Sequence, residues 1–264
     1  MKQSITHKNL RQSKTQLGFT LAEGATHVDL PPTKVSFGFT LAEVLITLGI
    51  IGVVAAMTIP NLIATHKAKR FRTQFLKSYS TIQQVFKQMQ ADDISIDPAD
   101  YPLQEYYKVF GKYLKGATDC GGQEYYSNND YKGEPCFNHR KKYYKNLQGK
   151  NATGLNPIVN DGEWLLPDGS LLLFENGGAR WGSKVYVTVD LNGFGNPPDR
   201  MGYDVFMFQL IDENLKTMGD TGTYYNNMDI YCNLKSNNIQ NGIACAQKAK
   251  ENPDYFKWVA KNLK

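Results

Sequence analysis

An uninterrupted apolar segment near the N-terminus constrains this chain more than any other feature of its sequence. Residues 39–63 read FTLAEVLITLGIIGVVAAMTIPNLI and contain a single charged side chain, Glu43. About 20 apolar residues in a helix, rising about 1.5 Å each, cover the roughly 30 Å hydrocarbon core of a bilayer. The buried core helix of a soluble protein is rarely so long and so apolar. The segment therefore predicts a helix that spans a membrane.

The residues that open this segment separate it from other kinds of membrane-directed segment. A secretory signal would end in small residues such as Val54-Ala55-Ala56, and a plain signal anchor would need no special start. Neither explains the hexapeptide Gly38-Phe39-Thr40-Leu41-Ala42-Glu43. A carboxylate inside a spanning helix costs about 2.5–3.5 kcal/mol on insertion scales. Glu43 therefore either reaches the water of the headgroup layer or has a partner.

The segment resembles the N-terminal region of type IV pilins and type II secretion pseudopilins. In that family a glycine is followed by phenylalanine or methionine, and a glutamate is the fifth residue after the bond that is cut. Gly38, Phe39 and Glu43 match all three positions, and Pro60 lies where many members carry a helix-kinking proline. The resemblance is very specific over residues 38–63 and moderate over the amphipathic stretch that follows.

The resemblance implies a processing pathway and a set of partners. A prepilin peptidase and methyltransferase would cut between Gly38 and Phe39 and N-methylate the new amine of Phe39. Because Gly38 has no side chain, an extended backbone can enter a narrow protease cleft there. In the family, the carboxylate at the position of Glu43 pairs with the freed amine of a neighbouring pilin or pseudopilin subunit, which sets the register of assembly.

The same resemblance implies a location and a leader. Before assembly the chain would lie in the lipid of a prokaryotic cytoplasmic (inner) membrane, as a single-pass protein with an exterior C-terminal domain. After assembly it could form an extracellular filament. Residues 1–38 would be the cleaved leader. They contain a copy of the motif at Gly18-Phe19-Thr20-Leu21-Ala22-Glu23, which we interpret as a remnant because no apolar run follows it.

Hydrophobic spacing beyond residue 63 predicts that the same helix continues outside the membrane and ends near Asp92, ahead of the Asp97-Pro98 breaker. We expect a membrane half at 39–63, an amphipathic half at 64–92 and an exterior α+β domain at 93–264. A second helix is expected from about 102 to 114. The periodic positions of the amphipathic half are Phe71, Phe75, Tyr79, Ile82, Phe86 and Met89.

The exterior domain carries strand patterns separated by turn signals. We expect strands at 164–166, 171–174, 184–191 and 203–211, the last of which closes the series. Residues 116–160 are rich in Gly, Asn, Tyr and Lys and predict a loop. Short connections favour an antiparallel meander. The expected fold class is α+β, with a long N-terminal transmembrane and amphipathic helix packed on an antiparallel β-sheet, as in the pilin-like architecture.

The four cysteines form no Cys-x-x-Cys pair, which argues against a zinc or thioredoxin-type site. In a domain outside the cytoplasm they favour two disulfides. Three pairings are possible, and we favour the two that close local loops. These are Cys120–Cys136 and Cys232–Cys245.

A loop rich in aspartate, asparagine and glycine between the last two expected strands resembles a calcium loop in part. Asp190 and Asn192 have the spacing of the first two ligands, but Phe194 stands where a third oxygen ligand belongs. A turn stabilised by Asn and Gly accounts for the same residues without metal. We expect no cofactor other than this calcium ion. Its candidate ligands are Asp190, Asn192, Asp199 and Asp204.

Composition argues against an enzyme and against a nucleic-acid partner. His7 and His27 lie in the leader and His66 lies beside the membrane, which leaves His139 as the one histidine of the exterior domain. The exterior domain therefore offers too few histidines to favour a zinc site or a Ser-His-Asp triad. Residues 39–264 hold 25 basic and 23 acidic side chains, too even a balance to attract a polyanion generally. One basic cluster, at 67–72, directly follows the apolar segment.

The sequence therefore predicts a non-enzymatic, prepilin-like subunit. A prepilin peptidase would process it, and it would assemble into a type IV pilus or a type II secretion pseudopilus. The alternative is a single-pass, membrane-anchored exterior binding domain that does not polymerise. The two differ in whether Glu43 is needed for more than anchoring.

Overall fold

The computed structural model describes residues 38–102, 105–122, 136–137, 143–153, 159–176 and 184–263. The expected leader, including the copy of the motif at 18–23, lies outside these residues except for Gly38. The chain divides into two compact units, Met1–Ile50 and Ile51–Lys264. The first contains the start of helix α1 (Leu41–Ala91), and the second is an α+β domain built around one six-stranded sheet.

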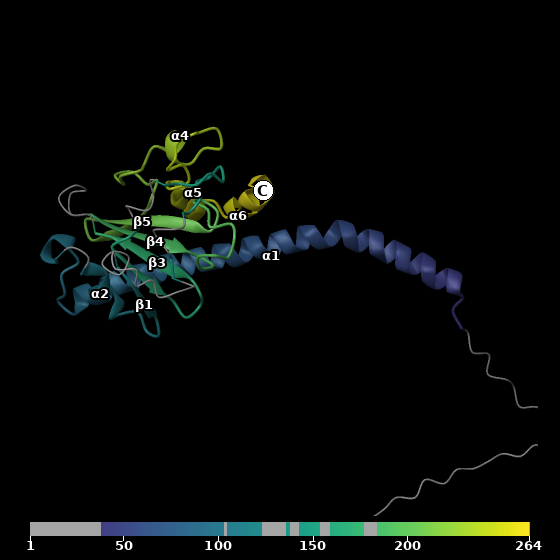
Figure 1. The fold of residues 1–264 in the computed structure, drawn as a ribbon, viewed down its shortest axis with the longest axis horizontal. Coiled ribbons are helices and arrows are strands. Elements are labelled where there is room, and N and C mark those ends of the chain that lie inside the picture. The colour runs from purple at the N-terminus through teal and green to yellow at the C-terminus, as the bar shows by residue number, and fades with distance from the viewer. Residues whose placement is uncertain are drawn as a thin grey trace, which may run out of the picture. The chain divides into compact units, whose positions relative to one another are not determined.

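The sheet is a simple meander, because each strand lies beside the strand that follows it in the chain (Figure 1). Every neighbouring pair is antiparallel, which confirms the expected topology. The strands are β1 (Thr118–Gly121), β2 (Gly162–Leu165), β3 (Leu171–Glu175), β4 (Val185–Asp190), β5 (Val205–Ile211) and β6 (Asn214–Thr217).

The four expected strands are present as β2 to β5, but two further strands were missed. The strand at 203–211 is not the last one, because the chain turns back at Asp212 and Glu213, both with positive φ, and continues as β6. Strand β1 lies inside the expected loop at 116–160 and pairs with β2. Each missed strand is four residues long and lies at an edge of the sheet.

Helix α1 ends one residue from its expected boundary, and the second helix is shorter than expected. The latter, α2, occupies the middle of the range 102–114. After α1, Asp97 caps a short 3-10 helix, η1, by accepting a hydrogen bond from the N–H of Ala99 at 2.8 Å. Three helices after the sheet had not been predicted. The described helices after α1 are η1 (Pro98–Asp100), α2 (Tyr106–Gly111), α4 (Met228–Tyr231), α5 (Cys245–Glu251) and α6 (Tyr255–Asn262).

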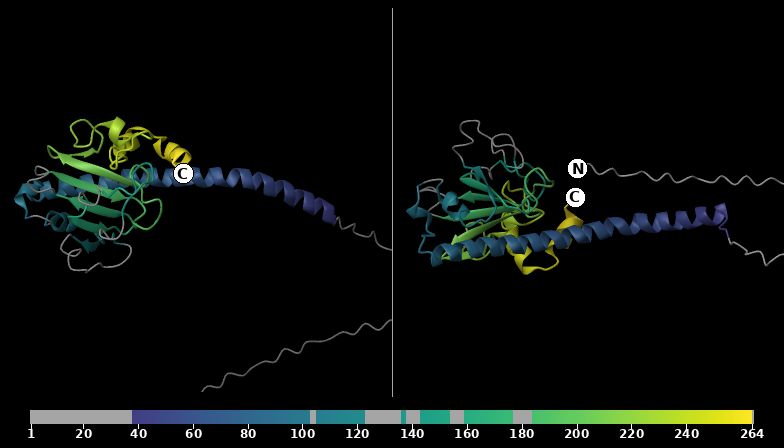
Figure 2. Two further views of the ribbon diagram at one scale, coloured as in Figure 1. Left: turned by 45° about the horizontal axis from the view of Figure 1, so that its top comes forward. Right: turned by 90° about the horizontal axis from the view of Figure 1, so that it is seen from below.

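The amphipathic half of α1 lies along one face of the sheet (Figure 2). Phe75 is fully buried at the centre of this contact. Its ring centroid lies 4.9 Å from that of Phe206 and 5.7 Å from that of Phe208, both on β5. It lies 5.9 Å from that of Phe256, on α6. Aromatic contacts of this kind add to the hydrophobic burial and fix the position of the helix on the sheet.

The other face of the sheet is covered as well, because every residue of β3 and β4 is buried. An aromatic group from the connecting segments forms part of this cover, with ring centroids 4.5 to 5.2 Å apart. Its members are Phe137, Tyr144 and Phe194. The sheet is therefore the middle layer of the domain, and polar side chains on its second face are shielded from water.

We predict that truncating the central aromatic residue of α1 destabilises the domain. Phe75→Ala should lower the free energy of unfolding by about 3–5 kcal/mol, because it leaves a cavity among three packed rings. Leu76→Ala is the matched control, since that side chain is 39% exposed and its loss should cost well under about 1 kcal/mol. Urea unfolding of the detergent-solubilised chain, followed by near-ultraviolet circular dichroism, measures both. Equal losses would contradict this packing.

Candidate functional site

The N-terminal part of α1 is apolar and exposed. The helix is 51 residues long, and its most apolar stretch is long enough to cross a membrane with none of it buried. Among the described residues, no other helix has these properties. An exposed apolar surface of this extent marks contact with lipid or with another protein. Membrane spanning is thus possible for this helix by length and composition.

Thr40 and Glu43 form a reciprocal hydrogen-bonded cap at the start of α1. The N–H and the hydroxyl of Thr40 each donate to Oε2 of Glu43 at 2.8 Å. The N–H of Glu43 donates in return to Oγ1 of Thr40 at 3.2 Å. This is a capping box, which satisfies backbone donors that the first turn of a helix leaves free. The Glu43 carboxylate therefore has a partner within its own chain.

The cap is a role for Thr40 that the sequence analysis missed, although the signal was present. A threonine followed three residues later by glutamate, just ahead of an apolar run, is the sequence pattern of a capping box. Gly38 and Phe39 precede the cap and lie open, with Phe39 87% exposed. A Cβ atom added at Gly38 would meet nothing within 4 Å. Both sides of the expected cleavage bond are thus accessible.

Pro60 lies inside α1, which is continuous through it. Proline has no N–H, so it cannot donate to the carbonyl of Ala56 one turn earlier. The helix tolerates this loss without ending.

The expected calcium ligands lie at the end of β4 and in the loop that leads to β5. Asp190, at the end of β4, is fully buried. Its Oδ2 accepts a hydrogen bond from the hydroxyl of Tyr144 at 3.1 Å, and its Oδ1 accepts one from the N–H of Asn192 at 3.3 Å. No sequence signal pointed to Tyr144, which is 46 residues away along the chain.

The remaining two aspartates bind backbone donors of the same loop. Asp204, also fully buried, accepts hydrogen bonds from the N–H of Asp199 at 3.1 Å and of Arg200 at 2.7 Å. Asp199 in turn accepts one from the N–H of Gly195 at 3.0 Å. The carboxylates therefore fold the loop on itself, as an Asx-stabilised turn does.

Burial makes the ionised forms of these carboxyls unfavourable. It raises the pKa of Asp190 well above its ordinary value, and the charges of Asp204 and Asp199 raise it further. Burial likewise raises the pKa of Asp204 to about 7, against partial compensation by backbone N–H groups. At neutral pH the cluster therefore favours a bound proton or a bound cation.

The residue types suit calcium, but their ligand atoms lie farther apart than those of a formed metal site. Carboxylate and amide oxygens are the ligands that calcium prefers, and Oδ1 of Asn192 is shielded from solvent without a hydrogen-bond partner. In the described part of the chain, one group of three Cys, His, Asp or Glu residues has ligand atoms that all lie within 4.8 Å of one another. It consists of Cys120, Cys136 and Glu163 and includes none of the loop aspartates. Those two cysteines form a disulfide and offer no thiolate. Calcium would thus have to draw the aspartates together.

A second buried carboxyl pair had not been predicted. Asp161 precedes β2 and Glu175 ends β3, so the two lie side by side at one end of the sheet. Burial raises the pKa of Glu175 to about 8, with the charge of Asp161 as the next cause. Oε2 of Glu175 is shielded from solvent and has no hydrogen-bond partner. The pKa of Glu175 is shifted in the same direction as those of Asp190 and Asp204, the carboxyls of the loop cluster. A pH experiment must therefore separate the effect of this pair from that of the loop cluster.

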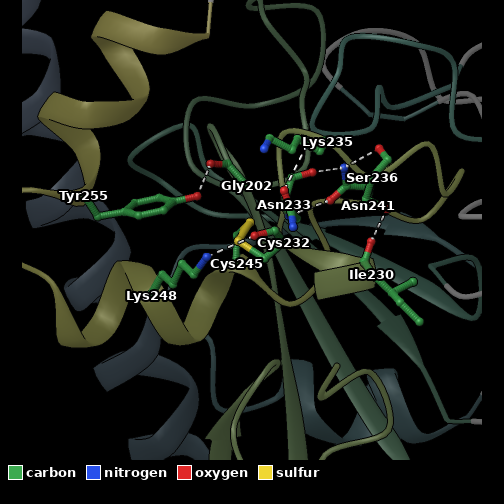
Figure 3. The surroundings of a disulfide bond; sticks show 10 residues. All are labelled: Gly202, Ile230, Cys232, Asn233, Lys235, Ser236, Asn241, Cys245, Lys248 and Tyr255. Atoms are coloured by element: carbon green, nitrogen blue, oxygen red, sulfur yellow. Dashed lines mark hydrogen bonds between the residues drawn. A yellow bond between two sulfur atoms is a disulfide. The ribbon is translucent and has the colours of Figure 1, made fainter. Parts of the chain in front are cut away.

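The cysteines pair as Cys120–Cys136 and Cys232–Cys245, the two local pairings favoured from the sequence. Figure 3 shows the surroundings of the second bond. There the side-chain amide of Asn241 donates to the carbonyl of Asn233 at 2.7 Å, while the ammonium of Lys248 donates to the carbonyl of Cys232 at 3.0 Å. The disulfide thus fastens the segment after α4 to the first turn of α5.

Comparison with known proteins assigns no relative. No family model, no curated protein and no solved structure matches this chain. The functional interpretation therefore depends on the residues and geometry of this chain.

We predict that the loop carboxyls make stability fall as pH rises. Because the folded pKa of Asp204 is about 7, the folded state holds a proton that the unfolded state releases above about pH 4. The free energy of unfolding, measured with a chelator present, should decline from about pH 4 to about pH 7. Calcium should restore stability more at pH 8 than at pH 5.

Asp190→Asn separates the effect of the loop carboxyls on stability from that of Glu175. Asparagine can still accept from the N–H of Asn192 and can donate to the hydroxyl oxygen of Tyr144. It should raise the free energy of unfolding at pH 8 by about 1–3 kcal/mol, because it removes a buried charge, and it should abolish any response to calcium. Asp93→Asn, at an exposed position, is the control. A variant that responds to calcium like the natural chain would contradict this role for Asp190.

Proposed function

We propose that this chain is a prepilin-like filament subunit. A prepilin peptidase cuts between Gly38 and Phe39, the new amine of Phe39 is N-methylated, and the mature chain assembles through α1. The product is a type IV pilus or a type II secretion pseudopilus. The observation that carries the proposal is the exposed apolar half of α1, in which the only charged residue, Glu43, lies one turn from the amine that cleavage would free.

The fold supports this proposal because the two halves of α1 have different surroundings. The half from Ala68 to Met89 buries its aromatic side against the sheet. The apolar half that precedes it has no such partner within the described chain. This division of one helix is what the pilin-like architecture requires, with lipid covering the apolar half first and other subunits later. We place the protein in a prokaryotic cytoplasmic membrane with its disulfide-bonded domain outside.

The capping box is compatible with a second partner for Glu43. A carboxylate has about four lone-pair sites, and Thr40 occupies two of them, both on Oε2. Oε1 can accept a hydrogen bond from the protonated amine of Phe39 in a neighbouring subunit. Hydrogen bonds to charged groups contribute about 1.5–3 kcal/mol net. In a filament core, away from water, this bond would favour one register over its neighbours.

Small residues on α1 support close contact between copies. A Cβ atom added at Gly49 or Gly52 would meet nothing within 4 Å, so this side of the helix is open to an approaching backbone. Gly52 and Ala56 also form a small-xxx-small pair, a pattern that permits close helix packing in lipid.

A second candidate function is an anchored exterior binding domain that never polymerises. The capping box favours it, because Thr40 satisfies Glu43 without any other subunit. In that case α1 would serve as an anchor alone, and no filament would depend on the charge of Glu43.

Glu43→Gln distinguishes the two functions. Glutamine preserves a capping box but cannot form an ion pair, so insertion and folding should persist. For a filament subunit, the amount of chain recovered in sheared filaments should fall about tenfold or more, as a loss of about 1.4 kcal/mol per contact implies. Quantitative immunoblots of filament and membrane fractions measure this.

Thr47→Ala, on the same exposed helix, is the control and should assemble normally. An unchanged filament yield for Glu43→Gln would contradict the subunit proposal. It would leave the anchored domain as the better account.

A further inference from the structure

A groove of about 550 Å³ lies in the second unit, where the apolar stretch of α1 ends. One wall is α1 and the other is the loop Asn192–Asn196. Leu62 and Ile63 form an apolar end, and Lys67 and Arg70 form a basic end. The groove therefore changes from apolar to cationic along the helix, which is the polarity of a phospholipid read from acyl chain to headgroup.

The basic end lies within reach of lipid phosphates if residues 39–63 span the bilayer. At about 1.5 Å per residue, Lys67 and Arg70 follow Ile63 by about 6 and 10 Å along the helix. The headgroup layer on each side of a bilayer is roughly 5–8 Å thick, so Lys67 lies within it and Arg70 lies just beyond it. Both side chains can extend their charged ends toward that layer while their stems cover apolar surface.

Lys67, Lys69 and Arg70 have no acidic partner among the described residues. Helix α1 contains no Asp or Glu after Glu43. Within the described part of the chain, no carboxylate lies within 4.0 Å of the charged nitrogens of Lys67, Lys69 or Arg70. The ammonium of Lys67 instead lies 5.3 Å from the ring centroid of Phe71. A cation that an aromatic ring holds in place, with no anion beside it, can still attract an anionic ligand.

The wall formed by the loop contributes donors. The side-chain amide of Asn196 donates one hydrogen bond to the carbonyl of Asn192 at 2.8 Å, and each amide NH₂ has two donors. One donor thus remains for a ligand. Asp190, just before this loop in the chain, accepts hydrogen bonds from Tyr144 and Asn192. Asp199 and Asp204, which follow the loop, accept from backbone N–H groups. They weaken the positive potential of the groove, but they do not pair with its lysine or arginine.

We propose that this groove binds an anionic phospholipid of the outer leaflet. The phosphate lies between Lys67 and Arg70, and an acyl chain follows Leu62 and Ile63. The charge of the groove and its continuity with the spanning segment favour lipid over an acidic segment of a second copy, because the body of the chain is close to neutral. The inference depends on the membrane insertion in the proposed function and is independent of polymerisation.

Native mass spectrometry of the full chain tests the proposal. The detergent-solubilised protein is equilibrated with equimolar phosphatidylglycerol and phosphatidylcholine of identical acyl chains. The natural chain should retain phosphatidylglycerol about tenfold more often, and the double variant Lys67→Ala/Arg70→Ala should bring the ratio close to one. Lys87→Ala/Lys112→Ala removes the same charge from exposed positions away from the groove and should keep the preference.

Two outcomes would overturn the proposal. The first is equal retention of both lipids by the natural chain, and the second is a preference that Lys67→Ala/Arg70→Ala leaves unchanged. If the natural chain retains both lipids equally and that variant loses filaments, the basic cluster is assigned instead to contact with a second copy. Carbonate extraction of native membranes, performed in parallel, separates these outcomes from failure of the proposed function. A chain released by carbonate is not inserted at all.

Discussion

The packing of one side of α1 against the sheet is the interaction on which the rest of the structure depends. Burial of Phe75 against Phe206 and Phe208 fixes the second half of the helix. Within the described ranges of the chain, nothing covers the apolar side chains of the first half, which remain exposed. A helix of this kind is stable in water along only part of its length. An exposed apolar remainder marks contact with lipid or with another protein, which is why membrane insertion and assembly are parts of one proposal.

Much of this architecture could be predicted because it follows from periodicity. The aromatic spacing between Phe71 and Met89 predicted the packed side of α1, and alternating or continuous apolar runs predicted β2 to β5. Strands β1 and β6 were missed because four-residue edge strands carry little pattern and are defined by the neighbour with which they pair. The expected loop at 116–160 was wrong at 118–121 for the same reason.

The candidate site residues likewise divide into those with a local sequence signal and those that only the fold brings together. Local signals were sufficient for the two short-range disulfides, which the structure contains, whereas the roles expected for Gly38 and Glu43 in cleavage and assembly stay predictions. The capping role of Thr40 was also local and was overlooked because Glu43 had already been assigned to assembly. Tyr144 could not have been predicted, since only the fold brings its hydroxyl to Asp190. The raised pKa of Asp204 likewise follows from burial by distant segments.

The central claim is that the chain is cut on the N-terminal side of its apolar helix and keeps that helix. Mass spectrometry of the N-terminal peptide of the mature protein, taken from native membranes, tests it most directly. The account predicts a peptide that begins with Phe39 and carries one methyl group on its amine. A peptide in which Gly38 and Phe39 are still joined, or a mature chain that begins near Met57 after removal of the apolar segment, would contradict it.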